Sequence, residues 1–188
     1  MISNTPPADM SIELYRRLLS TAQKIAAEKD VYRLCEIILT EAQDITGADG
    51  GTFYLVRQDE HRKDNRLEFI IVRNQSLGIT SETTARQQPA FPAVPLYKET
   101  HTASTANEHN IAAWAYHHRG LVNIADAYAA DNDDGRLFDF SGTHAFDQQT
   151  GYHSQSFLAV PLVGDNGRVI GVFQLINAID CNTGEIRA

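Results

Sequence analysis

The chain has 188 residues, of which 43% are hydrophobic and 21% are charged, a composition typical of one soluble globular domain with a buried core. Its net charge of −8, from 16 basic and 24 acidic side chains, argues against nucleic-acid binding, which requires a concentrated positive face. No apolar run approaches the ~20 residues that span a bilayer, and the first residues lack the basic and apolar blocks of a signal peptide. We therefore expect a cytoplasmic protein with no nucleic-acid and no membrane partner.

Two amphipathic helices are predicted near the start of the chain, after a Pro-rich segment at residues 1–10 that we expect to form a flexible arm. The apolar positions of the first helix recur at helical spacing. They are Leu14, Leu18, Ala22 and Ile25. The second helix follows Asp30, a suitable N-cap, and ends at Gly47. The short link between them predicts a helical hairpin or one long bent helix.

The pattern then changes to strands. Residues 51–57 and 67–72 are rich in β-branched and aromatic side chains, so they predict two strands joined by a polar hairpin loop. Three prolines at positions 89, 92 and 95 exclude a regular helix in that stretch. A short edge strand is expected at residues 94–97.

The second half of the chain alternates short helices and strands. A helix at residues 107–118 is followed by a strand at 121–124, and a helix capped by Thr143 ends at Gly151. Strands at residues 156–162 and 168–176 flank the turn sequence GDNG, a strong hairpin signal. The order of elements predicts an α+β fold with an antiparallel sheet and helices packed on it.

Sequence signatures of catalysis are missing. The chain has no Gly-x-Gly-x-x-Gly, no phosphate-binding Gly-Lys-Ser/Thr and no Gly-x-Ser-x-Gly motif. Its seven histidines form no His-x-x-x-His pair, and its two cysteines form no Cys-x-x-Cys pair, so neither a metal site nor a cofactor is expected. Cys35 lies in an apolar helical pattern, which predicts a buried thiol.

Residues 123–177 combine aromatic side chains with small hydroxyl residues and glycines, a composition that suits an apolar pocket with a few placed polar groups. A helix N-terminus at Thr143 would offer free backbone N–H groups to an anion. The alternative is that these aromatic side chains only close the core over the sheet.

Several stretches resemble a GAF domain, a module found in cyclic-nucleotide phosphodiesterases, bacterial adenylyl cyclases and response regulators. They are IAAWA at 111–115, NIADAY at 123–128, DQQTGY at 147–152, FLAVPL at 157–162 and GVFQLIN at 171–177. The stretch FDFSGT at 138–143 is most similar to sensors attached to bacterial HD-GYP phosphohydrolases and nucleotide cyclases. The resemblance implies a six-stranded antiparallel sheet with helices on both faces, in a domain at residues 11–180. Residues 181–188 would then begin a linker to an output domain.

The resemblance also implies a ligand pocket between the sheet and lid helices. The residues that it places there are Thr52, Ile111, Ala112, Phe140, Thr143, Phe146, Thr150, Ser154 and Gln174. The implied ligand is a small molecule, with cAMP and cGMP as candidates, and binding would order the lid at residues 131–151. The chain departs from cyclic-nucleotide-binding members at Ala178, where those members usually carry a lysine.

Three functions follow from this reading. The first is a non-catalytic sensory domain of a bacterial signalling protein, which binds a small ligand and forms a homodimer through its terminal helices. The second is a dimerisation or scaffold module without a ligand. The third, minor alternative is an enzyme similar to free methionine-sulfoxide reductases, which requires pocket cysteines that neither Cys35 nor Cys181 is placed to supply.

Overall fold

The computed structural model describes residues 8–59, 64–80, 91–99, 104–129, 137–180, 183–184 and 186. Most of the expected flexible arm, part of the expected lid and most of the expected linker lie outside these residues. Six strands form one sheet in which every neighbouring pair is antiparallel, in the order β3-β2-β1-β8-β7-β6. The strands are β1 Ala48–Asp59, β2 Asp64–Asn74, β3 Val94–Pro95, β6 Val122–Ile124, β7 Phe157–Val163 and β8 Val169–Ala178.

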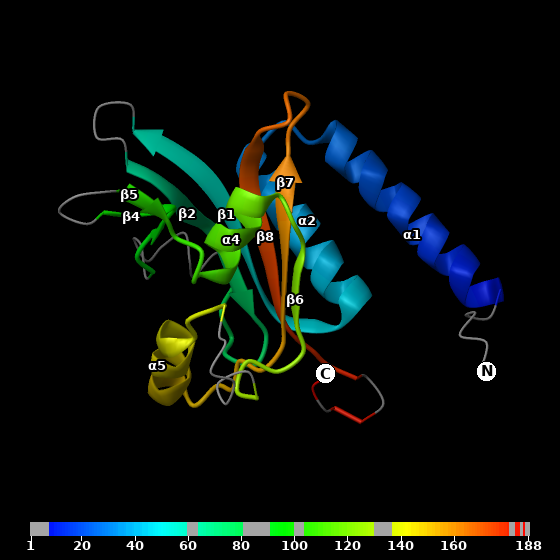
Figure 1. Cartoon of the computed structure of the whole chain (residues 1–188). Coiled ribbons are helices and arrows are strands. Elements are labelled where there is room, and N and C mark those ends of the chain that lie inside the picture. Colours follow the sequence, from blue (N-terminus) through cyan, green and yellow to red (C-terminus); the bar gives the residue numbers. More distant parts are fainter. Residues whose placement is uncertain are drawn as a thin grey trace, which may run out of the picture.

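Helices cover both faces of this sheet (Figure 1). Helix α2 (Val31–Thr46) lies on one face, and α4 (Ile111–His118) and α5 (Ser141–Thr150) lie on the other. Helix α1 (Ala8–Ala27) packs on α2 and projects away from the sheet. The predicted α+β architecture is therefore confirmed. None of the helices in the described part of the chain has the length and apolar character needed to cross a membrane.

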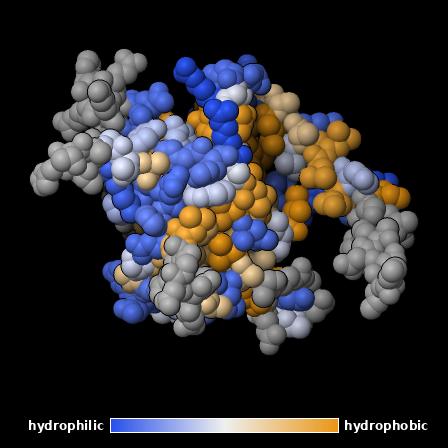
Figure 2. Space-filling model, in the orientation of Figure 1, coloured by the Kyte–Doolittle hydropathy of each residue, from blue (hydrophilic) through white to orange (hydrophobic). Residues whose placement is uncertain are grey.

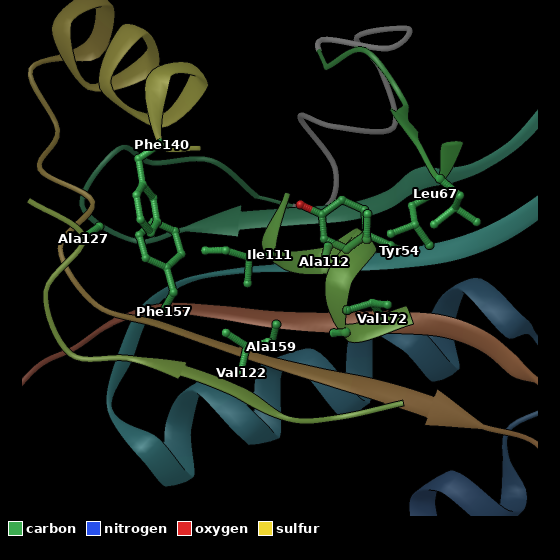
Figure 3. Close-up of a cluster of buried hydrophobic side chains, with 13 residues drawn as sticks. Tyr54, Leu67, Ile111, Ala112, Val122, Ala127, Phe140, Phe157, Ala159 and Val172 are labelled. Atoms are coloured by element: carbon green, nitrogen blue, oxygen red, sulfur yellow. The ribbon is translucent and has the colours of Figure 1, made fainter. Parts of the chain in front are cut away.

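Strand alternation divides the core into two layers. On β1, Phe53 points toward α2 and packs with Leu39, whereas the next residue, Tyr54, points toward α4 and packs with Leu67. Figure 3 shows the layer on the α4 side, with the ring of Phe140 beside that of Phe157. Each layer contains fully buried apolar side chains, so both faces of the sheet contribute to stability.

The helix boundaries follow their capping residues. Asp30 accepts a hydrogen bond from the amide of Arg33, and Gly47 ends α2 with φ of 71°, as predicted. Helix α4 begins later than expected, because the side chain of Asn110 accepts from the amides of Ala112 and Ala113. Thr143 is not a cap, and that prediction was wrong. Helix α5 begins two residues earlier, at Ser141.

Most of the apolar stripe of α1 is exposed, although Ile25 is partly buried. Leu14 and Leu18 are 44% and 45% exposed, whereas the polar side of the helix faces α2. Glu41 on α2 accepts hydrogen bonds from Arg17 and Lys24, so the side of α1 that carries these residues lies against α2. Apolar residues consequently gather on the free side of α1 (Figure 2).

The expected edge strand at residues 94–97 is divided between two sheets. Val94 and Pro95 pair with β2 in the main sheet. Strand β4 (Tyr97–Glu99) instead pairs with β5 (Ser104–Ala106), a strand not predicted from the sequence, in a separate two-stranded sheet. Leu96 lies between them and is fully buried, so the chain turns around this side chain.

Candidate functional site

A cavity of about 260 Å³ lies between the sheet and helices α4 and α5. Thr52 on β1 and Gln174 on β8 form part of its floor, and Phe140, Thr143 and Phe146 reach it from the start of α5. The space expected between sheet and lid is therefore present in the described part of the structure.

The floor of the cavity carries polar groups from two adjacent strands. Thr52 and Gln174 are register partners and are only 5% and 8% exposed. Burial raises the pKa of Tyr54, which keeps its ring hydroxyl neutral beside Thr52. The amide of Gln174 adds two donors and an acceptor to this surface. A polar edge of a ligand could therefore find partners at the floor.

Aromatic rings line one side of the cavity. Tyr54 and Phe69 have ring centroids 4.7 Å apart, and the ring of Phe91 stacks on Phe69 at 5.3 Å. Phe91 also contacts Phe146 on α5, with centroids 6.1 Å apart, so the rings connect the floor to the helix above it. Such ring faces suit a flat apolar ligand.

A buried carboxylate anchors α5 to the rest of the domain. Asp147, 5% exposed, accepts hydrogen bonds from the hydroxyl of Tyr128 and from both the amide and the hydroxyl of Ser154, each at 2.7 Å. Ser154 lines the cavity, so this cluster holds α5 and the cavity wall together. Three short bonds satisfy the charge that burial would otherwise disfavour.

A second tyrosine–aspartate pair holds the segment after α5. Tyr152, which lines the cavity, donates a hydrogen bond of 2.6 Å from its hydroxyl to Asp49. Burial, and then the hydrogen bond to Asp49, raises the pKa of Tyr152, so this hydroxyl keeps its proton. Asn177 accepts from the amides of Gln155 and Ser156, which fixes the same segment from β8.

The charges around the cavity are arranged unevenly. Of the described lining residues, Arg73 alone is basic, and its guanidinium donates to Thr40 on α2, at the opposite face of the sheet. Asp139 lies at the start of α5, where the hydroxyl and the amide of Ser141 hydrogen-bond its carboxylate and lower its pKa. The described lining therefore offers hydrogen-bonding groups and rings more than positive charge.

The structure brings seven of the nine predicted site residues to the cavity. They are Thr52, Ile111, Phe140, Thr143, Phe146, Ser154 and Gln174. Ala112 instead lies 1% exposed within the apolar core. Thr150 is exposed, and its hydroxyl donates to the backbone oxygen of Phe146, so it does not line the cavity.

Sequence reasoning missed several lining residues. Phe69, Phe91 and Tyr152 lie on separate segments, and no local pattern in the sequence connects them. The DQQTGY stretch did include Tyr152 and Asp147, but not the roles that their long-range partners give them. Among the residues that the structure describes, no group of three His, Cys, Asp or Glu side chains could hold a metal ion. Cys35 is buried at the α2 face, away from the cavity lining.

Comparison with known proteins agrees with this architecture. The chain is 26% identical over 171 residues to a cGMP-specific 3',5'-cyclic phosphodiesterase of Drosophila pseudoobscura pseudoobscura, covering 88% of this chain and 13% of that protein. A relative of the same description from Drosophila virilis is 25% identical, with 88% and 16% covered. The chain thus spans less than a fifth of either relative's length.

Solved structures show the same fold. The GAF domain of a phosphoenolpyruvate-protein phosphotransferase from Coxiella burnetii matches with a TM-score of 0.59 at 13% identity, over 89% of this chain and 79% of that one. The GAF domain family matches residues 30–186, which is most of the chain and includes the sheet, α4, α5 and the cavity between them. This family is typically sensory or regulatory. The chain belongs to the GAF domain family.

Proposed function

We propose that this chain is a non-catalytic regulatory domain of a cytoplasmic bacterial signalling protein that binds one small ligand in the cavity between the sheet and α5. The observation that carries the proposal is the cavity of about 260 Å³, which has a polar floor and an aromatic side. Ligand sites commonly have volumes of ~300–1,000 Å³, so a cavity of about 260 Å³, just below that range, suits one ligand at the small end.

The chemistry of the lining points to a ligand with a flat ring. Phe69 and Phe91 offer ring faces, while Thr52 and Gln174 offer hydrogen bonds to a polar ring edge. Cyclic nucleotides carry such a ring, and the relatives are described as cGMP-specific phosphodiesterases. cAMP and cGMP are therefore the first ligands to test.

Among the described residues, the cavity offers no thiol for catalysis, and Cys181 lies outside them. Free methionine-R-sulfoxide reductase from Neisseria meningitidis shares the fold, with a TM-score of 0.55 at 18% identity, which is a similarity of fold alone. A thiol mechanism requires a reactive cysteine at the cavity. Cys35 is buried in the opposite layer of the core, and burial raises its pKa to about 11. A nucleophilic thiolate is thus disfavoured there.

Isothermal titration calorimetry with cAMP, cGMP and the parent nucleosides tests ligand binding. The Gln174→Leu variant should bind any ligand that the unmodified chain binds with an affinity lower by at least about tenfold, because the polar ring edge of the ligand would lose its buried partner. Gln149→Ala, an exposed change on α5, is the matched control and should bind as the unmodified chain does. Absence of heat with every compound would remove the nucleotide version of the proposal.

The free apolar face of α1 favours a second role, homodimerisation through the terminal helices. Tyr15 and Leu19 are 72% and 64% exposed on a helix whose polar side already faces α2. Two such stripes could bury each other across a two-fold axis. Sedimentation velocity of the unmodified chain and of Leu18→Glu tests this role. A monomer at tens of micromolar in both would argue against it.

A further inference from the structure

Asp49, at the start of β1, joins three parts of the domain through one side chain and one carbonyl group. It is 5% exposed, and its carboxylate accepts from the hydroxyl of Tyr152 at 2.6 Å and from the hydroxyl of Ser76 at 2.8 Å. The amide of Ser76 donates at 3.1 Å to the carboxylate oxygen that also accepts from its hydroxyl, Oδ1. Tyr152 lines the cavity, whereas Ser76 follows the end of β2.

The carbonyl oxygen of Asp49 connects this cluster to α2. It accepts from the side-chain amide of Gln43 at 3.1 Å and from the backbone amide of Gln75 at 3.0 Å. Gln43 lies in the last turn of α2, where its own carbonyl accepts from the amide of Gly47. A shift of Tyr152 would thus act on the C-terminal end of α2 through Asp49.

Helix α2 in turn holds α1. Glu41, two residues before Gln43, bonds to Arg17 and Lys24 of α1, and Asp44 bonds to Arg17 at 2.7 Å. The chain of contacts therefore runs from the cavity wall to the helix that carries the free apolar face. The steps around Asp49 use buried or partly buried polar groups, which have few alternative partners, whereas Lys24 and Asp44 at the α1 end are exposed.

We propose that Asp49 is a positioning residue that fixes the Tyr152 wall of the ligand cavity and couples that wall to the C-terminal end of α2. The coupling has a signalling meaning only under the function proposed above, because it then transmits occupancy of the cavity to α1 and α2. The hydrogen bonds that would carry the coupling involve only residues of this chain, so the coupling can be measured without a ligand.

The domain supplies its own control for this coupling. Tyr128 donates to Asp147, which also takes two bonds from one serine, Ser154. The arrangement around Asp49 has the same composition, but its carbonyl also reaches Gln43. Tyr152→Phe and Tyr128→Phe each remove one hydroxyl donor to a buried aspartate, so the two variants differ in which segments they affect.

Amide hydrogen exchange of the whole chain, resolved by NMR, separates the two variants. Tyr152→Phe should speed exchange at Gly47, Gln75 and Ser76 on the order of tenfold, as expected for loss of one hydrogen bond to a charged acceptor. Tyr128→Phe should speed exchange at Gly151 and Ser154 by a similar factor and leave Gly47 unchanged. Unchanged exchange at Gly47 in Tyr152→Phe would overturn the proposal.

A double variant distinguishes coupling from general loosening. In a Gln43→Met background the effect of Tyr152→Phe on Gly47 should disappear, while its effect on Ser76 should persist, because only the α2 branch has been cut. An undiminished effect on Gly47 would also overturn the proposal. These measurements need no ligand, so a failure of the coupling is distinguishable from a failure of ligand binding in the calorimetry.

Discussion

Replacement of Asp147 by alanine should destabilise the domain more than any other alanine substitution on α5, because Asp147 is the buried residue of this helix. Asp147 accepts hydrogen bonds from the amide and the hydroxyl of Ser154. Both donors are buried, because Ser154 is only 2% exposed. Each unsatisfied buried donor costs ~1–3 kcal/mol, and the half-buried hydroxyl of Tyr128 loses less because water can replace its partner. We expect a total loss of about 3–5 kcal/mol.

Asparagine at position 147 provides the finer comparison. Its amide keeps one acceptor for the Ser154 amide and can donate to the Ser154 hydroxyl, so the loss should be only about 1–2 kcal/mol. Gln148→Ala, an exposed neighbour on α5, should change stability by less than ~0.5 kcal/mol.

Urea unfolding followed by the fluorescence of Trp114, the single tryptophan of the chain, measures these differences. The midpoint should fall in the order expected from the lost bonds, with the slope of the transition unchanged. A loss below ~1 kcal/mol for Asp147→Ala would refute the reasoning that the two serine donors have no other partner.

Three further experiments test other parts of the structure. Gly51→Ala should cost about 1–3 kcal/mol in urea unfolding, since a Cβ there would lie 2.6 Å from a methyl group of Leu39; an unchanged midpoint would mean that α2 adjusts freely. Cys35, with its pKa raised to about 11 by burial, should resist iodoacetamide at pH 8 until urea unfolds the chain, as peptide mass spectrometry would show. Folding lowers the pKa of Asp139, so its ionised carboxylate stabilises the start of α5 at pH values above ~3.9, the pKa of aspartate in the unfolded chain. This contribution to stability is lost as the pH falls through the pKa of Asp139 in the folded protein. The NMR shift of the Ser141 amide should therefore titrate with a midpoint below ~3.9, and a midpoint above it would contradict the hydrogen-bonded carboxylate.

The sequence by itself determined the elements whose signals are local. Asp30 and Gly47 bound α2 because capping depends on residues within one helical turn. The GDNG turn fixes the hairpin between β7 and β8, where the amide of Gly164 bonds to the carbonyl of Arg168. Alternation along β1 and β8 then decides which side chains face each layer of the core.

Only the tertiary structure decided the composition of the cavity and the orientation of α1. Tyr152 and Asp49 are separated by 103 residues, and Phe91 meets Phe146 only because α5 folds back over the sheet. Helical spacing placed Leu14 and Leu18 on one face of α1, but whether that face is buried was decided by how α1 packs on α2, where Arg17 and Lys24 pair with Glu41. Local patterns specify which residues share a face, whereas the partner of that face depends on contacts between distant segments.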